Sequence, residues 1–552
     1  MKWSTACIDW ERRITSGQSL IPFGPLFPDE AASALRQFDE LRIVDAAGSP
    51  TIGESCRPWV REFAGTIFGS YDHDSGRRLI RDFFLLISKK NSKSTIAAAI
   101  MLTALIRNWR KSAEFLIIAP TVEIANNSFY PARDMVRADD ELRDLMHVQE
   151  HYRTITHRES GAYLRVVAAD NESVGGKKAV GVLVDELWLF GKRPNADGML
   201  IEATGGLASR PEGFAIYLST QSDEPPAGVF RAKLQYARKV RDGEISDPLF
   251  LPLLYEFPRS MIEAKGYMLP ENFGITNPNL GVSVDPAFIE RGLTIAQETG
   301  QEAVVGVLAK HLNIEIGIAL RSDRWAGADH WEACAVESLT LNELIARSEV
   351  ITIGIDGGGL DDLLGLAVVG RCKETREWIT WSKAWAHPSV LERRKSEAAR
   401  FRDFERDGDL VIVSEIGQDV EQVADVVATI HESGLLDKIG ADPVGIGAIV
   451  DAIVDAGVPS EKIVGISQGW KLAGAIKTTE RKLAEMTMRH GGRPMMSWCI
   501  GNAKVELRGN AVVITKQAAG TAKIDPLAAL FNAVSLMALN PSAAPKYQMM
   551  FV

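Results

Sequence analysis

The fold of the amino-terminal half of the chain can be predicted from one stretch, Phe83-Phe84-Leu85-Leu86-Ile87-Ser88-Lys89-Lys90-Asn91-Ser92-Lys93-Ser94-Thr95. Its first five residues are apolar, its middle is polar and basic, and an Ala-rich helical pattern follows it. A strand, a tight turn of backbone N–H groups, a lysine, a Ser or Thr and a helix start are the parts of a phosphate-binding loop. The pattern predicts such a loop over residues 88–95.

The glycines of a typical phosphate-binding loop are missing from this one. With Lys93 at the position of the motif lysine, Ile87 and Ser92 stand where Gly is expected. A serine held at positive φ costs about 1 kcal/mol, which a folded protein tolerates. On this stretch alone, a basic surface turn before a helix is the alternative interpretation.

A second motif, about 90 residues later, favours the nucleotide site. The apolar run Val180–Val184 ends in Asp185 and Glu186. In a P-loop ATPase the first acid orients the Mg²⁺ shell and the second acts on the attacking water. Taken alone, the two acids could instead cap the next helix. A third run ends in Ser219-Thr220-Gln221, where polar side chains could sense a γ-phosphate or form a plain turn.

Short apolar runs alternate with helical patterns from about residue 60 to residue 220, which predicts a parallel α/β sheet. The runs are Phe83–Ile87, Phe115–Ala119, Leu164–Val167, Val180–Val184 and Phe214–Leu218. Residues 221–345 do not show this alternation, and a new α/β pattern begins at Ile351.

Three widely separated aspartates mark the carboxy-terminal half. Asp356 ends the run Ile351–Ile355, Asp442 ends a short strand, and Asp525 opens the last helix. Two-metal cleavage of a phosphodiester needs hard oxygen ligands that converge from distant parts of the chain. This layout indicates an RNase H-like nuclease. The alternative interpretation is that Asp356 and Asp442 are turn residues and that Asp525 is a helix N-cap. His490 has no visible partner, and we interpret it as structural.

Composition excludes several classes of protein. The 552 residues carry 62 Lys and Arg against 72 Asp and Glu, so the net charge of -10 argues against a globally basic protein that wraps nucleic acid. Five scattered cysteines show no zinc spacing, which predicts free thiols. The longest apolar stretch, Ile96–Ile106, is about half of the length of a membrane helix, so no membrane association is expected.

With these motifs the chain resembles the large subunit of phage DNA-packaging terminases. The resemblance rests on SKKNSKST (residues 88–95) and the strand that ends in Val-Asp-Glu. It continues through Gly205–Pro211, Asn277–Gly281 and the stretch from Lys310 to Asn313. The fold class that it implies is α/β, with an N-terminal P-loop (ASCE-type) ATPase domain and a C-terminal RNase H-like nuclease domain.

The resemblance also implies residue roles. Residues 88–95 would hold ATP, with Lys93 on the β/γ-phosphates and Ser94 and Asp185 on Mg²⁺. Glu186 would be the catalytic carboxylate and Thr220 the coupling residue. Arg210 would stabilise charge in a neighbouring subunit, with Lys89 or Lys90 as the alternative in cis. In the nuclease domain, two Mg²⁺ or Mn²⁺ ions would be held by the catalytic aspartates Asp356, Asp442 and Asp525.

We therefore expect an amino-terminal helical segment over 1–60, an ATPase domain over 61–345, a nuclease domain over 346–540 and a tail over 541–552. The ATPase domain would include a linker subdomain at about 222–345. The partners implied are double-stranded DNA, a portal protein, a small terminase subunit and other copies of the chain in a ring, by analogy a pentamer, on the procapsid. The implied location is the host cytoplasm, without incorporation into the mature virion.

Two alternatives stay open at this point. One is an ATP-dependent DNA translocase or helicase fused to a nuclease, acting in repair or phage defence. The other is a structural DNA-binding protein whose motifs have decayed, for which Ser92 is the best indication.

Overall fold

The computed structural model describes residues 3–168, 178–193, 195–317, 325–336, 339–443, 446–508, 511–516 and 523–543. The chain divides into two compact units, Met1–Ile316 and Gly317–Val552. This division lies earlier than the boundary expected near 345. The reason is that Trp325, Trp331 and Cys334 are buried in a core cluster of the second unit. Of the expected tail, residues 544–552 lie outside the described part of the chain.

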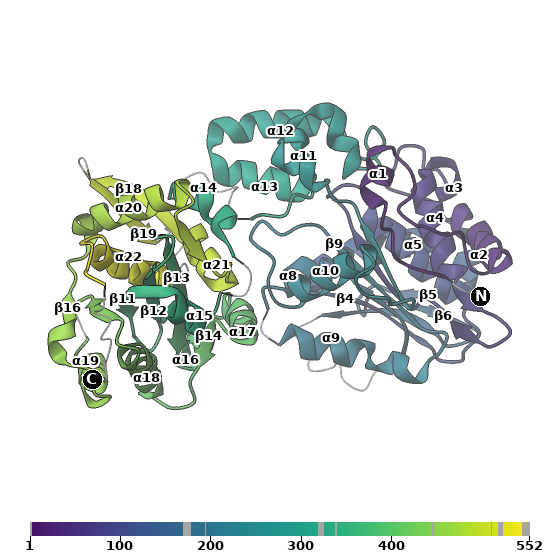
Figure 1. Cartoon of the computed structure of the whole chain (residues 1–552). Coiled ribbons are helices and arrows are strands. Elements are labelled where there is room, and N and C mark those ends of the chain that lie inside the picture. Colours follow the sequence, from purple (N-terminus) through teal and green to yellow (C-terminus); the bar gives the residue numbers. More distant parts are fainter. Residues whose placement is uncertain are drawn as a thin grey trace. The chain divides into compact units, whose positions relative to one another are not determined.

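The first unit is an α/β sandwich built on one sheet (Figure 1). Its helices are α1 (Trp10–Thr15), α2 (Pro28–Glu40), α3 (Ile52–Ser55), α4 (Pro58–Phe68), α5 (Lys93–Ile106), α6 (Val122–Arg137), α7 (Asp140–Leu145), α8 (Leu187–Phe190), α9 (Ala196–Gly205), α10 (Gly228–Arg241), α11 (Arg259–Glu263), α12 (Pro286–Thr299) and α13 (Gln301–His311). Its strands are β1 (Tyr71–Asp72), β2 (Arg77–Arg78), β3 (Asp82–Leu86), β4 (Glu114–Ala119), β5 (Met146–Gln149), β6 (Thr154–His157), β7 (Tyr163–Ala168), β8 (Ala179–Val184), β9 (Phe214–Ser219) and β10 (Phe250–Leu254).

The main sheet of this unit has the strand order β10-β3-β9-β8-β4-β7-β6-β5. The five predicted runs form β3, β4, β7, β8 and β9, and these strands pair in parallel as expected. The structure adds β10, which pairs in parallel with β3. This strand lies within residues 221–345, where apolar runs and helical patterns do not alternate in the sequence. At the other edge β5 and β6 are antiparallel, so the sheet is mixed.

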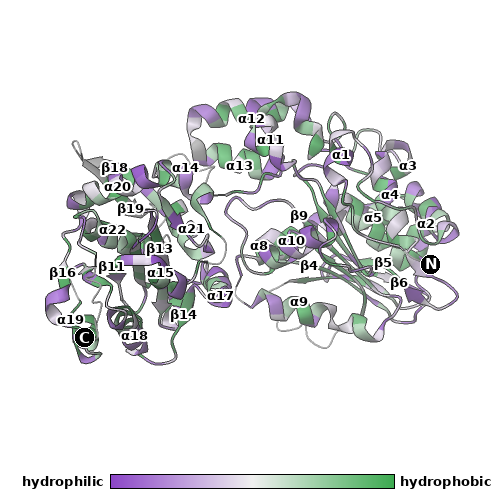
Figure 2. Cartoon of the chain, viewed as in Figure 1, coloured by the Kyte–Doolittle hydropathy of each residue, from purple (hydrophilic) through white to green (hydrophobic). Residues whose placement is uncertain are grey.

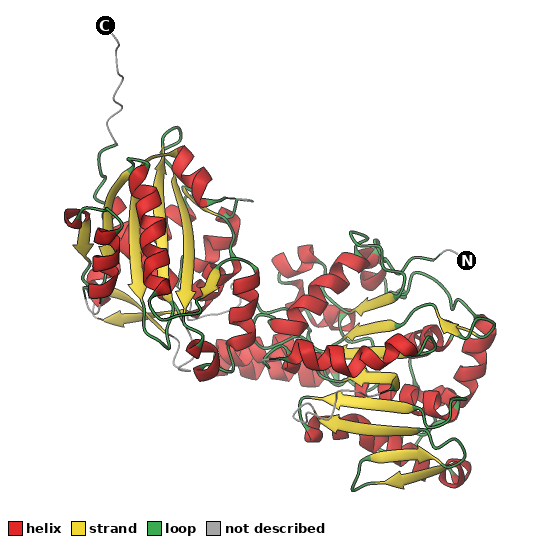
Figure 3. Cartoon of the chain, turned by 90° about the horizontal axis from the view of Figure 1, so that it is seen from below, coloured by secondary structure: helices red, strands yellow, loops and turns green. Residues whose placement is uncertain are grey.

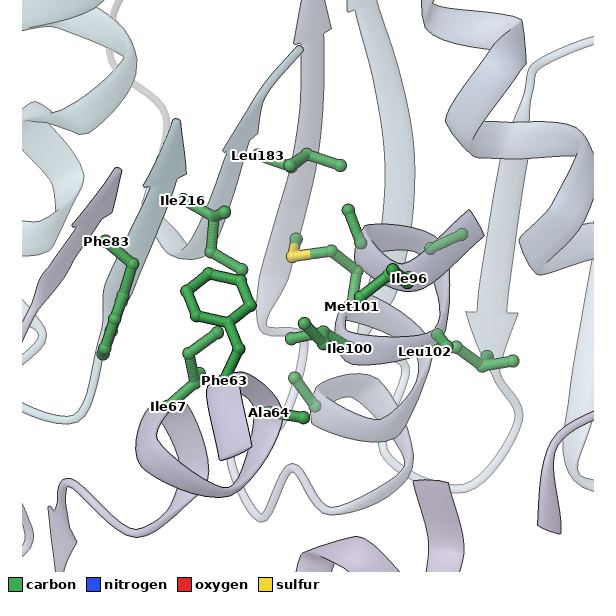
Figure 4. Packing of buried hydrophobic residues seen from close by; sticks show 14 of the residues in the cluster. Phe63, Ala64, Ile67, Phe83, Ile96, Ile100, Met101, Leu102, Leu183 and Ile216 are labelled. Carbon is green, nitrogen blue, oxygen red and sulfur yellow. The ribbon is translucent and has the colours of Figure 1, made fainter. Parts of the chain in front are cut away.

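The helix α5, which follows the predicted phosphate-binding loop, is buried on all sides. Residues Ala97–Thr103 are almost inaccessible to solvent. A helix that is apolar all round belongs inside a protein core, which explains the longest apolar stretch of the sequence. Figure 4 shows the side chains that pack α5 against the sheet and α4, among them Phe63, Ile67, Phe83, Ile100, Met101, Leu183 and Ile216. By contrast, α2 and α12 show both polar and apolar bands (Figure 2).

The second unit is built on another sheet, with helices beside its strands (Figure 3). Its helices are α14 (Ala328–Trp331), α15 (Leu341–Arg347), α16 (Ser389–Arg393), α17 (Ala398–Arg406), α18 (Gln418–Glu432), α19 (Gly447–Asp455), α20 (Ala473–Ala484), α21 (Pro494–Asn502) and α22 (Asp525–Met537). Its strands are β11 (Ser348–Gly357), β12 (Leu364–Cys372), β13 (Trp378–Ala386), β14 (Leu410–Ile412), β15 (Leu436–Ala441), β16 (Ile463–Gly465), β17 (Met488–His490), β18 (Ala503–Arg508) and β19 (Ala511–Lys516).

The strand order in the larger sheet of this unit is β14-β13-β12-β11-β15-β16. The strand β12 runs antiparallel between β11 and β13, whereas β15 and β16 run parallel to β11. A hairpin of long strands followed by parallel strands on the far side is the arrangement expected of the RNase H-like fold. Among the helices of the described ranges, none has the length and apolar character to cross a membrane.

Candidate functional site: a nucleotide site and a carboxylate edge

The loop between β3 and α5 has the backbone of a phosphate-binding loop. Ser92, which stands where Gly is expected, has φ 59° and ψ 20°, and Lys90 is also left-handed at φ 70°. Both conformations turn the chain tightly into the start of α5, where the first N–H groups of a helix have no partner within the helix. Lys93 is only 6% exposed and Asn91 is fully buried. The loop is therefore not a basic surface turn.

Asn91 ties this loop to a distant part of the chain. Its amide nitrogen donates to Ser88 O at 3.1 Å and to Asn277 Oδ1 at 2.8 Å. Its side-chain oxygen accepts from the backbone N–H of Asn279 at 3.0 Å, and its carbonyl accepts from the Asn279 amide at 3.1 Å. The Asn277–Gly281 stretch thus holds the loop through the hydrogen bonds that Asn277 and Asn279 form with Asn91.

The two acids that follow β8 point into the same region. The Lys93 ammonium lies 3.1 Å from Glu186 Oε1. Ser94 Oγ donates to Asp185 Oδ2 at 3.3 Å, and Ser128 Oγ donates to the same oxygen at 2.8 Å. Glu186 is the residue before α8, but its side chain forms no capping hydrogen bond there. The helix-cap alternative therefore does not describe Glu186.

The two acids differ in their electrostatic surroundings. Asp185 is fully buried, and this burial, together with the charge of Glu186, holds the pKa of Asp185 above its usual range. Burial also acts to raise the pKa of Glu186. The Lys93 ammonium and the Trp188 indole N–H outweigh that effect and hold this pKa below its usual range. Glu186 is therefore ionised at neutral pH.

Several buried polar atoms near the loop have no hydrogen-bond partner in the described structure. They are Ser88 Oγ, Thr220 Oγ1 and both side-chain amide atoms of Gln221. Ile87 N donates to Ser219 O at 3.1 Å, so the loop and the end of β9 are adjacent. Since unpaired buried polar atoms are costly, this cluster fits a polar ligand such as a phosphate.

Arg210 is not brought to this site. It lies before the start of β9, whereas Lys93, Glu186 and Thr220 lie at or beyond the carboxyl ends of β3, β8 and β9. The length of β9, about 16 Å at the rise of a strand, separates the two edges of the sheet. Arg210 therefore does not lie at the phosphate-binding edge of its own sheet, and its role in a neighbouring subunit stays a prediction.

In the second unit the backbone brings the three predicted aspartates to one edge of the sheet. Asp356 is near the end of β11, and Asp442 directly follows β15, in register with it through the pair Ile355 and Ala441. Asp525 is the first residue of α22. A Cβ placed on Gly357, the neighbour of Asp356, would lie 3.4 Å from the Asp525 Cβ.

Glycines allow α22 to cross the sheet closely enough to place Asp525 there. A Cβ on Gly354 would lie 1.9 Å from Ala529 O, and one on Gly365 would lie 2.7 Å from the Asp525 carbonyl carbon. The helix is held by Asn532 Nδ2, which donates to Ile355 O at 2.9 Å, and by Thr352 Oγ1, which donates to Ala533 O at 2.9 Å. No side-chain cap is formed at the start of α22, so Asp525 is not there as an N-cap.

Over the residues that the structure describes, no three His, Cys, Asp or Glu side chains gather closely enough to hold a metal ion. Lys523 forms an ion pair with Asp362 beside this edge. The backbone placement fits a carboxylate metal site, and the metal-binding roles of the three aspartates stay a prediction.

Sequence reasoning missed several residues of the nucleotide site. Ser128 contacts Asp185 from inside α6, where nothing in the helical pattern marks it. Trp188 donates its indole N–H to Glu186 Oε2 at 2.5 Å. The sequence signal that could have indicated this contact is the position of Trp188, two residues after Glu186. Lys310 lies over the Trp188 ring with its Nζ 3.1 Å from the ring centroid, and burial lowers the pKa of Lys310 to about 8.

The first unit is thus an ATPase of the P-loop class and the second has the sheet of an RNase H-like nuclease. Two family profiles match the chain. One is described as the ATPase domain of the terminase large subunit and matches residues 58–238. The other is described as its endonuclease domain and matches residues 267–540. The chain belongs to the large terminase subunits and has the ATPase and endonuclease domains of that family. The helicase-nuclease and structural-protein alternatives are not favoured.

Individual relatives are distant. The large terminase subunit of Enterobacteria phage HK97 is 22% identical over 506 residues, which cover 89% of this chain and 91% of the relative. The protein YmfN of Escherichia coli (strain K12) is 24% identical over 283 residues, which cover 48% and 59%. Among solved structures, that of the HK97 bacteriophage large terminase covers 92% of this chain and 99% of its own, at 20% identity and a TM-score of 0.47.

Proposed function

We propose that this protein is the motor and nuclease of a tailed-phage packaging complex. It hydrolyses ATP to move double-stranded viral DNA into the procapsid, and it cuts concatemeric DNA. The observation that carries the motor half is the Lys93–Glu186 ion pair at the head of α5, beside the buried Asp185. The nuclease half rests on the convergence of three aspartates at one sheet edge.

In the ATPase site each polar group has one proposed task. The N–H groups at the start of α5 and the residues of the loop, Ser88–Thr95, bind the phosphates. Lys93 leaves Glu186 and pairs with the β- and γ-phosphate oxygens. Glu186, ionised at neutral pH, then orients the attacking water and accepts its proton. Thr220 contacts the γ-phosphate side and responds to its loss.

The residues fit a magnesium ion. Ser94 and Asp185 present a hydroxyl and a carboxylate oxygen 3.3 Å apart, which is the hard oxygen donor set that Mg²⁺ prefers. Bound there, the ion supplies neutralisation of charge on the phosphates. Arg210 is proposed to serve the site of the adjacent subunit, because it lies at the opposite edge of its own sheet.

The test of the ATPase site is Lys93→Ala. We expect it to reduce ATP turnover by about a hundredfold or more, because a phosphate-binding charge in the transition state is lost. Steady-state phosphate release measures this. The control is Lys111→Ala, which removes an exposed lysine of the same unit and should leave turnover unchanged. Unaltered turnover in Lys93→Ala would refute the assignment of this loop.

In the nuclease site we propose that Asp356, Asp442 and Asp525 hold two Mg²⁺ or Mn²⁺ ions. Such ions supply activation of water and stabilisation of the leaving 3′ oxygen of a phosphodiester. The chain supplies carboxylate oxygens on three rigid elements, the ends of β11 and β15 and the start of α22. The Asp362–Lys523 ion pair joins the loop after β11 to Lys523, which lies two residues before α22.

The test of the nuclease site is plasmid cutting in Mn²⁺ by Asp356→Asn and Asp442→Asn. Each should lose cutting by about a hundredfold or more, since a neutral amide replaces a charged ligand. The control is Asp455→Asn, which changes an exposed aspartate at the end of α19 in the same unit. Equal cutting by the wild type and both site variants would disprove the carboxylate assignment.

The remaining partners are proposed from the family. They are a portal protein on the procapsid, a small terminase subunit that selects the DNA, and further copies of this chain in a ring of about five subunits. The proposed place of action is the host cytoplasm. The position of Arg210, at the edge of its sheet opposite the phosphate-binding loop, supports the proposal that it acts on ATP held by another copy in a ring. Mixing Lys93→Ala and Arg210→Ala chains tests this, because hydrolysis should recover partly if Arg210 acts between subunits.

A further inference from the structure

The side chain of Trp188 contacts the carboxylate of Glu186. The indole N–H donates to Glu186 Oε2 at 2.5 Å, and Trp188 N donates to Ser219 Oγ at 3.1 Å. Glu186 itself has a left-handed backbone, φ 53° and ψ 53°, which a non-glycine residue holds only when its surroundings enforce it. The indole N–H is thus a partner of the Glu186 carboxylate that does not depend on Lys93.

The ammonium of Lys310 lies over the ring of Trp188. It lies near the end of α13 and reaches the indole face, with Nζ 3.1 Å from the ring centroid. The same ammonium donates to Gln221 O at 3.2 Å and lies 3.8 Å from Asp223 Oδ2. The attraction between a cation and an aromatic face grows as the cation loses water, and this side chain is only 13% exposed.

The backbone of Lys310 is joined to the phosphate-binding loop. Its carbonyl accepts from Lys89 N at 2.8 Å. Asn313, three residues further on, accepts from Gln221 N at 2.9 Å and donates to Tyr255 O at 2.7 Å. The end of α13 therefore contacts the loop, the end of β9 and Trp188 at once.

We infer that Lys310 is a positioning residue of the ATPase. It fixes the ring of Trp188, and the Trp188 N–H in turn fixes the carboxylate that acts on the attacking water. The inference rests on the proposed role of Glu186. It also links α13 to the hydrolysis machinery, because a shift of this helix would move Lys310 away from the Trp188 ring and so loosen the contact of that ring with Glu186.

The experiment compares Lys310→Met with Lys310→Arg in the full chain. Met retains most of the length without the charge, whereas Arg keeps a cation that can stack on the ring. We expect Lys310→Met to lower kcat by about tenfold while the affinity for a slowly hydrolysed ATP analogue stays within about twofold. Lys310→Arg should keep kcat near the wild-type value. A control is Lys111→Met, which removes an exposed lysine of the same unit whose ammonium donates to Glu159 O, away from Trp188, and should leave kcat unchanged.

Trp188→Phe supplies an independent test. It keeps an aromatic face for Lys310 and removes the N–H that binds Glu186. We expect a loss of kcat similar to that of Lys310→Met, and a double variant no slower than Trp188→Phe alone, because both act on one contact. Losses that multiply in the double variant would overturn the inference, as would an unchanged kcat in Lys310→Met. Equal melting temperatures exclude a folding defect.

Glu186→Gln separates this inference from the proposed function. If Glu186→Gln abolishes hydrolysis while Lys310→Met leaves kcat unchanged, only the role of Lys310 fails. If Glu186→Gln itself retains hydrolysis, the proposed role of Glu186 fails, and the inference fails with it.

Discussion

His490 shows how a single buried side chain makes stability depend on pH. Its Nδ1 accepts from Gly492 N at 3.0 Å, so the proton of the neutral ring is on Nε2, which donates to Trp331 O at 2.7 Å. The ring also stacks on Trp331 at a centroid distance of 3.5 Å. Burial lowers the pKa of His490 to about 4. A second proton would break the contact with Gly492.

We predict that acid destabilises the protein through His490. The folded pKa of about 4 lies below the value of about 6.5 for an unfolded chain, so the unfolded state binds more protons between these values. Stability is therefore lost as the pH falls from 6.5 to 4, by about 3 kcal/mol in total from this residue. Denaturant unfolding at several pH values measures the effect. His490→Gln should flatten the dependence and the exposed His330→Gln should not. Parallel curves for wild type and His490→Gln would contradict the prediction.

For single residues, the sequence was sufficient where a local motif identified the position. Ser92 stood where a glycine was expected, and its φ of 59° confirms the strained turn. His490 was interpreted as structural, and its stacking on Trp331 confirms this. Ser128 could not be predicted, because its contact with Asp185 depends on how α6 packs beside β8 and on no local pattern.

At the scale of elements, α22 depends on glycine for its close crossing of the sheet. A Cβ at Gly354 would lie 1.9 Å from Ala529 O and 2.5 Å from Ala533 N, both backbone atoms that cannot rotate away. Any side chain at this position must displace the helix. Since Asp525 begins α22, the displacement moves a proposed metal ligand as well.

We therefore predict that Gly354→Ala destabilises the second unit by about 1–3 kcal/mol and reduces DNA cutting strongly. Thermal unfolding and the Mn²⁺-dependent plasmid assay measure the two effects. The control is Gly474→Ala in α20, where a Cβ meets nothing within 4 Å and a helical Ala is favoured over Gly. This change should leave cutting intact and stability equal or higher. A Gly354→Ala protein as stable and active as the wild type would disprove the packing argument.

The elements that alternate in the sequence were predicted, and those that depend on distant partners were not. The runs that form β3, β4, β7, β8 and β9 are apolar and alternate with helical patterns, so they could be predicted as strands. The strand β10 is equally buried, but it follows a basic helix and contains Pro252, and only its pairing with β3 makes it a strand. The closeness of Asp525 to Gly357 arises from a long-range helix crossing.

At the scale of the whole molecule, each proposed activity draws its residues from one compact unit. Lys93, Asp185 and Glu186 belong to Met1–Ile316, and the three aspartates belong to Gly317–Val552. Each unit has its own buried hydrophobic clusters, which is the property of a part that unfolds cooperatively. Ligands of one site should then stabilise mainly the unit that binds them.

This leads to a prediction for calorimetry of the full chain. A slowly hydrolysed ATP analogue with Mg²⁺, at 100 times its dissociation constant, adds about 2.7 kcal/mol to the stability of the unit that binds it. For a unit of this size, that corresponds to a rise of about 5 °C in its unfolding temperature. We expect two transitions, of which the analogue raises one. Lys93→Ala should abolish that shift, whereas Gly354→Ala should lower only the other transition. A shift that persists in Lys93→Ala would place the nucleotide elsewhere, and a single transition moved by both changes would show that the units unfold together.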